Sequence, residues 1–177
     1  MGEFLIDIKN LSVEYKTDEA TVYAVNDVEL SVKKGETLGL VGETGAGKTT
    51  IAKSILGILP KPQATITSVS IEFEDRELLE LKEKEMQKIR GDKIAMIFQD
   101  PMTALNPVET VGYQIYEAII QHNKIKKSEA RQRACDMLEM VGIPGERYGE
   151  YPHQFSGGMK QRVVIAMALA CNPELLL

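Results

Sequence analysis

The chain contains 177 residues, of which 44% are hydrophobic, so it is long enough to bury the core of one ordinary domain. Its formal net charge of -5 argues against a general nucleic-acid or anionic-membrane surface. No apolar run approaches the roughly 18 residues of a membrane span, and the first residues lack the pattern of an export signal. Cys135 and Cys171 lack metal-ligand or redox spacing, which favours buried, reduced thiols. We therefore expect a protein that is neither exported nor membrane-spanning by itself.

Two strands are predicted near the N-terminus. Residues 4–15 alternate apolar and polar side chains, as a half-buried strand does, and a second strand is expected over residues 21–25. Tyr15 ends the first strand upstream of a glycine-rich loop, where its ring could stack on a purine. Taken alone, it is better interpreted as a tyrosine at the rim of the core.

The glycine-rich loop, residues 42–49, fits the pattern G-x-x-x-x-G-K-[ST] and predicts a nucleotide site. Its glycines would let successive backbone N–H groups converge on phosphates, while Lys48 would reach the β/γ-phosphates and Thr49 the magnesium ion. Residues 36–41 predict a buried strand entering the loop, and residues 50–59 predict the helix leaving it. That helix, beginning at the lysine, would point its positive dipole end at the same anion.

The middle of the chain combines strands with a charged segment. A proline-containing break ends the first helix, residues 64–74 predict a strand, and residues 76–90, rich in both charges, predict a solvated helix. Residues 94–98 predict a buried strand that leads through Gln99 to Asp100 and a loop. Asp100 could be a magnesium-directed carboxylate or only the start of an Asp-Pro turn, and the intervening Gln99 weakens the first interpretation.

The remaining sequence is mainly helical. Amphipathic helices are predicted over residues 109–123 and 128–141, followed by a helix over residues 160–171 and the start of an apolar strand at Leu175. Ser156 is placed as an N-cap, and the glycines after it could expose helix amides to a second phosphate. His153 is better explained as a loop or core residue than as a catalyst.

In this order, the motifs resemble the ATP-binding subunit of ABC transporters over essentially the whole chain. Residues 42–49 correspond to the Walker A loop, Gln99 to the Q-loop glutamine, and Phe155-Ser156-Gly157-Gly158-Met159 to the LSGGQ signature. Tyr15 matches the adenine-stacking aromatic position, which reverses the interpretation favoured above. Residues 98–107 and 151–159 look like the dipeptide/oligopeptide importer branch, which also includes nickel importers.

The resemblance implies an α/β fold of the P-loop NTPase type: an ABC-type nucleotide-binding domain with an antiparallel β edge and a helical subdomain. The expected parts are a nucleotide-binding core (residues 1–100), a helical subdomain (101–155), and the signature helix with the start of the Walker B strand (156–177). ATP and Mg²⁺ are the implied cofactors, with Lys48 and Gln99 in catalytic roles and Thr49 and Gln99 at the metal. The implied nucleotide-binding residues are Tyr15, Gly42, Glu43, Thr44, Gly45, Ala46, Gly47, Lys48, Thr49, Thr50, Ser156, Gly157 and Gly158.

The resemblance also implies a function and partners. Two such subunits would enclose ATP between the Walker A loop of one and the signature of the other, and the Gln99 loop would transmit closure to a membrane permease. The expected outcome is uptake of di- or oligopeptides driven by ATP at the cytoplasmic face of the membrane. An extracytoplasmic substrate-binding protein would take part indirectly, and no nucleic acid would be involved.

One part of the family pattern is not present. In the family, the strand beginning at Leu175 continues into the Walker B aspartate and the glutamate that activates water, so the chain looks truncated and is expected to hydrolyse little ATP alone. Strands that flank the phosphate-loop strand would also be missing, leaving apolar surface unpaired. Two alternatives stay open: another P-loop NTPase that uses Asp100 at its metal, or a nucleotide-binding fragment without turnover.

Overall fold

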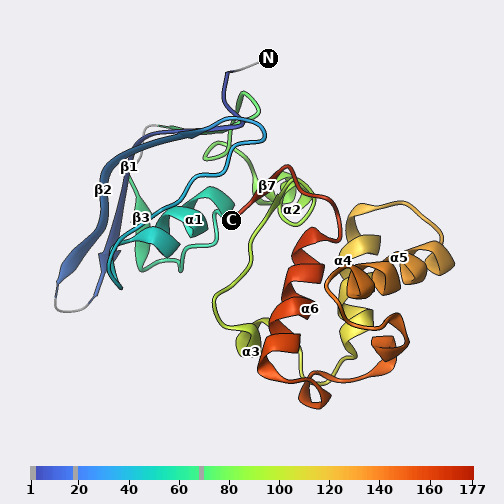
Figure 1. The fold of residues 1–177 in the computed structure, drawn as a ribbon. Coiled ribbons are helices and arrows are strands. Elements are labelled where there is room, and N and C mark those ends of the chain that lie inside the picture. The colour runs from blue at the N-terminus through green and yellow to red at the C-terminus, as the bar shows by residue number, and fades with distance from the viewer. Residues whose placement is uncertain (1–2, 18–19, 68–69) are drawn as a thin grey trace. The chain divides into compact units, whose positions relative to one another are not determined.

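The structure, a computed structural model, describes residues 3–17, 20–67 and 70–177 (Figure 1). The chain divides into two compact units, Met1–Gln87 and Lys88–Leu177. The described part of the first unit contains an antiparallel sheet, the glycine-rich loop and the helix that follows this loop, whereas the second unit is mainly helical. Within the described residues, no helix combines the length and hydrophobicity needed to cross a membrane.

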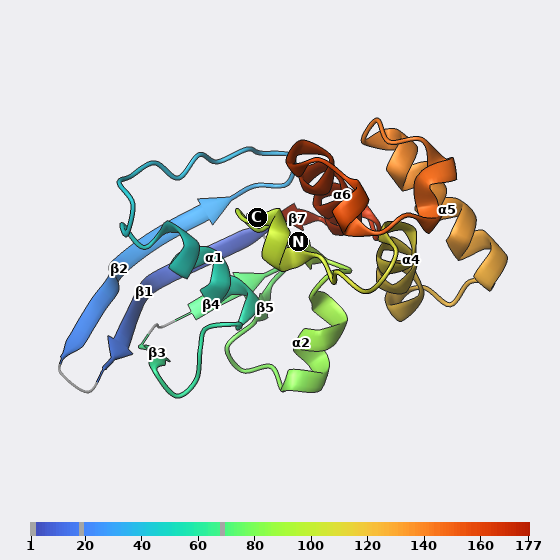
Figure 2. The same ribbon diagram turned by 90° about the horizontal axis from the view of Figure 1, so that it is seen from below.

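The sheet of the first unit is organised around β1 (Ile6–Lys16), which lies between β2 and β4 (Figure 2). β2 (Thr21–Val32) pairs along one edge of β1, and it continues beyond the predicted end at residue 25. On the other edge, β4 (Ser70–Phe73) pairs with the beginning of β1 and β3 (Ala64–Ile66) with its end. β5 (Arg76–Glu77) pairs with β4.

A bulge keeps the apolar side chains of β1 on the core face. Ile8 and Leu11 are both buried although they are three positions apart, because the pairing register with β2 shifts between them. Asn10, inside the bulge, adopts a left-handed φ of 52°, and its side-chain amide donates a hydrogen bond of 2.7 Å to Asp27 Oδ1. In a regular strand, side chains three positions apart point to opposite faces of the sheet. The extra residue in the bulge instead puts Ile8 and Leu11 on the same buried face.

The prediction of a buried strand over residues 36–41 is wrong. Val41 is 97% exposed, and Leu38 and Leu40 are also exposed. A buried strand needs neighbours that satisfy its backbone N–H and C=O groups, and no strand in the described part of the chain pairs with this run. Hydrophobicity alone therefore does not make it a strand.

The helices of the first unit differ from prediction at their ends. α1 (Lys48–Leu56) begins at the lysine, as predicted, but stops before residue 59 because Gly57 takes a left-handed φ of 62° and its N–H bonds the carbonyls of Lys53 and Ser54. The helix predicted over residues 76–90 is reduced to α2 (Glu83–Ile89), since a turn at Glu74 and Asp75, both with positive φ, starts a hairpin instead.

The strand predicted over residues 64–74 is observed as two strands, β3 and β4, which pair with different parts of β1. The predicted apolar position Val69 lies outside the described residues. Because β3 and β4 pair with different parts of β1, the structure has two strands where one was predicted.

The second unit contains a short parallel pair, β6 (Ile94–Ala95) with β7 (Leu175–Leu176). A hydrogen bond of 2.9 Å from the Ile97 amide to the Leu177 carbonyl continues this pairing. The strand start at Leu175 is confirmed, whereas the strand predicted over residues 94–98 ends early and Phe98 is exposed.

Three helices build the core of the second unit: α4 (Val111–His122), α5 (Lys127–Met140) and α6 (Gly157–Leu169), which pack against one another (Figure 1). The first two match the predicted helices within about two residues. The chain between α5 and α6 forms two short 3₁₀ helices that the sequence did not predict, η1 (Gly145–Gly149) and η2 (Pro152–Gln154), and η1 contacts α4 and α5. The fully buried members of the core are Val111, Ile115, Ile119, Ala130, Ala134, Leu138, Ile143, Val163 and Ala166.

Candidate nucleotide-binding site

The glycine-rich loop of the first unit depends on Gly47. Gly45 and Gly47 have left-handed φ values of 88° and 81°, which residues with a Cβ rarely adopt. A Cβ on Gly47 would also overlap the carbonyl oxygen of Ala24 in β2 and lie 3.1 Å from a methyl group of Val25. The loop therefore rests directly on the sheet, and only glycine allows that approach.

Lys48 lies at the start of α1 and reaches back over the loop. Its Nζ donates hydrogen bonds of 2.6 Å to the carbonyl oxygens of Gly42 and of Glu43. The positive charge is thus held beside the backbone of residues 42–47, so an anion that enters the loop would meet the ammonium group.

The N-terminus of α1 is open to an outside acceptor. Gly47 is the N-cap and makes no side-chain capping hydrogen bond. Ile51 is the first residue of the helix whose amide bonds to a carbonyl one turn back, that of Gly47, at 2.9 Å. The amides of Lys48, Thr49 and Thr50 therefore point out of the helix end without an intrahelical partner. This donor set, with the adjacent ammonium group, fits a phosphate chain.

The other predicted residues of the first unit occupy less informative positions. Gly42, Glu43, Thr44, Gly45 and Ala46 are exposed, as is Thr49. Tyr15 is half-buried near the end of β1, paired with Val22 and Ala64. Among the described residues, no hydrogen bond links Tyr15 to the loop.

Gln99 and Asp100 lie in the second unit, after β6. Gln99 is exposed. Asp100 caps α3 (Pro101–Ala104), a short helix where a loop was predicted, and its Oδ1 accepts the Met102 amide at 2.9 Å. The geometry favours the turn interpretation of Asp100, and the described residues contain no group of three carboxylate, histidine or cysteine side chains arranged to bind a metal.

Ser156 forms the N-cap of α6, as predicted. Its Oγ accepts a hydrogen bond of 3.4 Å from the amide of Met159, so the helix begins at Gly157 rather than at the predicted Lys160. Gly157 and Gly158 are exposed, and a Cβ built on either would meet nothing within 4 Å. Another molecule can approach the backbone of both glycines closely.

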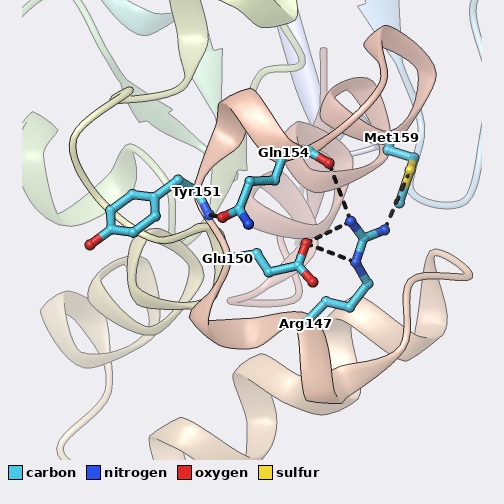
Figure 3. Close-up of polar contacts among 5 residues, drawn as sticks. All are labelled: Arg147, Glu150, Tyr151, Gln154 and Met159. Carbon is cyan, nitrogen blue, oxygen red and sulfur yellow. Dashed lines mark hydrogen bonds and ion pairs between the residues drawn. The ribbon is translucent and has the colours of Figure 1, made fainter.

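Arg147 in η1, which no sequence motif indicates, contacts the segment around Ser156 (Figure 3). Its guanidinium group donates to Glu150 Oε2 at 2.9 Å and 2.6 Å and to the Gln154 carbonyl at 3.3 Å. The hydrogen bond to Glu150 raises the pKa of Arg147 and holds the pKa of the Glu150 carboxyl below its ordinary value. Nothing in the motif spacing indicates this contact, because it depends on how η1 and η2 fold back.

Comparison with known proteins identifies the family of this chain. Residues 25–177 match the ABC transporter family. The dipeptide transport ATP-binding protein DppD of Bacillus subtilis (strain 168) is 51% identical over 99% of this chain and 53% of its own length. The oligopeptide transport ATP-binding protein OppD of the same organism is 49% identical over 98% of this chain and 49% of its own length. The chain thus spans about half the length of the curated relatives it matches.

Solved structures show the same fold. The dimeric structure of MJ0796, a bacterial ABC transporter cassette, superposes with a TM-score of 0.86 and 32% identity, covering 97% of this chain and 72% of that one. A post-hydrolysis state of the same cassette, bound to ADP and Pi, superposes with a TM-score of 0.86 and 31% identity. The predicted α/β, ABC-type P-loop fold is therefore confirmed. The family match and the relatives together show that this chain belongs to the ABC transporter family, and the solved structures show that it has the fold of that family's ATP-binding cassettes.

Proposed function

We propose that the protein carrying this chain is the ATP-binding motor of an importer and couples ATP binding and hydrolysis to the uptake of di- or oligopeptides. The observation that carries the proposal is the loop at residues 42–49, with Lys48 held over its carbonyls and the first amides of α1 left open. The names of the relatives, which are dipeptide and oligopeptide transport ATP-binding proteins, support the substrate class.

In this proposal the loop binds the phosphates of ATP. The hydrogen-bond donors to the phosphates are backbone groups of two segments. They are the amides at the start of α1, at Lys48, Thr49 and Thr50, and the backbone of the loop, at Gly42, Glu43, Thr44, Gly45, Ala46 and Gly47. Lys48 moves from its loop carbonyls to the β/γ-phosphates, and Tyr15 stacks on the adenine. The Thr49 hydroxyl and Gln99 would hold Mg²⁺, which would supply positive charge to neutralise the charge that develops on the phosphates.

A second subunit completes the site. Ser156, Gly157 and Gly158 of one subunit contact the ATP bound to the loop of the other, and that second subunit is either an identical or a related ATPase. The Gln99 loop and the helical subdomain at residues 101–155 transmit closure to a membrane permease, and an extracytoplasmic substrate-binding protein supplies the peptide. The dimeric structures of MJ0796 support the paired arrangement. The subunit would lie at the cytoplasmic face of the membrane without crossing it.

The test compares Lys48→Ala with Lys53→Ala in the complete protein assembled with its permease. Both changes remove one positive charge from α1, but only Lys48 contacts the loop. Lys48→Ala should weaken Mg-ATP binding more than tenfold, and it should abolish hydrolysis and ATP-driven uptake of a labelled dipeptide. Lys53→Ala should retain all three.

Peptide and nickel uptake are measured in parallel. Uptake of Ni²⁺ but no peptide would contradict the proposed substrate class while leaving the motor function intact. Equal ATP binding by Lys48→Ala and Lys53→Ala would contradict the nucleotide site itself.

A further inference from the structure

Arg147 contacts the signature segment on both sides of Ser156. Before the serine, its Nη2 donates to the Gln154 carbonyl, and its guanidinium carbon lies 4.2 Å from the centroid of the Phe155 ring. After the serine, its Nη1 lies 3.6 Å from the Met159 sulfur. One side chain therefore brackets the turn that begins α6 (Figure 3).

Phe155 and Met159 are the two positions at which this segment departs from LSGGQ. Leucine has no aromatic face to receive a guanidinium group, and glutamine has no polarisable sulfur, so neither contact would exist in the common pattern. Phe155 is only 5% exposed and belongs to the core of the second unit. The two departures are thus linked through contact with the same arginine.

The 3₁₀ helix η1, which carries Arg147, is anchored to α4. The Glu150 carbonyl accepts the Val111 amide at 2.9 Å, at the start of α4. The Tyr148 ring lies so close to Gly112 that a Cβ there would overlap it. Because η1 is fixed to the helical core at two points, Arg147 is held in place and can in turn hold the segment around Ser156.

Glu150 determines what Arg147 can contribute. The carboxylate accepts two hydrogen bonds from the guanidinium group, and both side chains are only partly exposed. A guanidinium group paired in this way offers little net charge to a neighbouring anion, but it holds a fixed orientation. Its contribution to the turn is therefore geometric.

We propose that Arg147 is a positioning residue that sets the orientation of the Ser156-Gly157-Gly158 turn through Phe155 and Met159. This inference rests on the proposed function, in which that turn contacts ATP bound to a second subunit. Arg147 itself touches no nucleotide; it acts by keeping the turn in the orientation that closure requires.

The experiment compares Arg147→Met with Arg131→Met in the complete, assembled protein. Arg131 is a matched control, since its guanidinium carbon also lies over an aromatic ring of the second unit, 4.9 Å from the Tyr148 centroid. We expect Arg147→Met to lower kcat for ATP hydrolysis about tenfold while the affinity of the phosphate loop for Mg-ATP stays unchanged. Arg131→Met should keep both, and Arg147→Lys should recover part of kcat.

Amide hydrogen exchange separates positioning from general loss of stability. In Arg147→Met, the amides of Met159 and Lys160, which bond to Ser156, should exchange about tenfold faster. Exchange in the middle of α4, at Ile115 and Ile119, should not change. Equal acceleration in α4 and α6, or no difference from Arg131→Met, would overturn the inference.

A double-mutant cycle with Phe155→Leu tests the proposed route. If Arg147 acts through the aromatic face, Arg147→Met should have a smaller effect on kcat in the Phe155→Leu background than alone. Equal effects in the two backgrounds would count against this route. If Lys48→Ala retained hydrolysis, the proposed function would be contradicted. The hydrogen-exchange and double-mutant results would still show whether Arg147 orients the turn.

Discussion

The two helices that begin within glycine-containing motifs, α1 and α6, start in different ways. α1 has Gly47 as its N-cap, with no side-chain acceptor, and carries Lys48 at its first position. α6 has Ser156 as its N-cap, and the serine hydroxyl already accepts one amide of the first turn. The first helix end leaves its amides to an outside acceptor, whereas the second is partly satisfied internally.

The difference indicates how each end would contribute to a nucleotide site. The loop before α1 includes a positive charge, because the Lys48 ammonium group is hydrogen-bonded to the loop carbonyls. The α6 turn is adjacent to a cation that Glu150 already neutralises, so its backbone geometry matters more than local charge. We infer that the first end provides most of the binding energy and the second provides orientation.

The largest effect is expected at the α1 end, from Gly47→Ala. The added Cβ would overlap the Ala24 carbonyl and force a left-handed φ on alanine, which should cost about 2 kcal/mol of unfolding free energy. Mg-ATP affinity should fall by at least about tenfold, because the loop can no longer rest on β2. Chemical denaturation and nucleotide titration measure the two quantities.

Gly149→Ala is the control for this change. A Cβ at Gly149 meets nothing within 4 Å, so the substitution should alter stability by less than about 0.5 kcal/mol and leave ATP affinity intact. Similar losses in both variants would show that Gly47 has no special role in the loop.

A smaller effect is expected at the α6 end, from Ser156→Ala. Loss of the hydroxyl cap should cost about 1 kcal/mol, and ATP hydrolysis should fall while binding to the phosphate loop stays the same. Thr110→Ala is a close control, since Thr110 caps α4 through a bond of the same length, 3.4 Å, to the Tyr113 amide. It should cost similar stability without loss of hydrolysis; if it lowers hydrolysis equally, the effect is one of stability alone.

The smallest effect concerns the pH dependence of the Arg147–Glu150 pair. The pKa of the Glu150 carboxyl is lowered in the folded protein, chiefly by the hydrogen bond from Arg147. Such a group stabilises the fold above its unfolded pKa, and that contribution is lost as the pH falls through the folded pKa. The stability difference between the unmodified protein and Glu150→Gln should therefore be full at neutral pH and shrink below pH 4.5.

Denaturation curves across that pH range measure the difference. Glu146→Gln, on the same 3₁₀ helix, is the control, because Glu146 forms no ion pair among the described residues. A difference for Glu150→Gln that stays constant down to pH 3, below the ordinary pKa of a glutamate side chain, would contradict the assignment.

Local features of the site could be predicted from the sequence, and features that depend on distant partners could not. The Ser156 cap and the start of α1 were predictable because each is decided by residues within one helical turn. Residues 36–41 were misassigned because a strand requires paired neighbours that hydrophobicity does not reveal. Arg147 was missed because its contacts with Phe155 and Met159 form only when η1 and η2 fold back beside α6.

In a pair of subunits, we expect the N-terminus of α1 from one subunit and the N-terminus of α6 from the other to contact the same phosphate chain. The most direct test uses an ATP analogue with a photoreactive group on its γ-phosphate, followed by mapping of the labelled peptides in the assembled protein. Label is expected in two segments of this chain, residues 42–49 and residues 156–159, and label should be lost from the first segment in Lys48→Ala. Label confined to residues 42–49, or absent from both segments, would contradict this expectation.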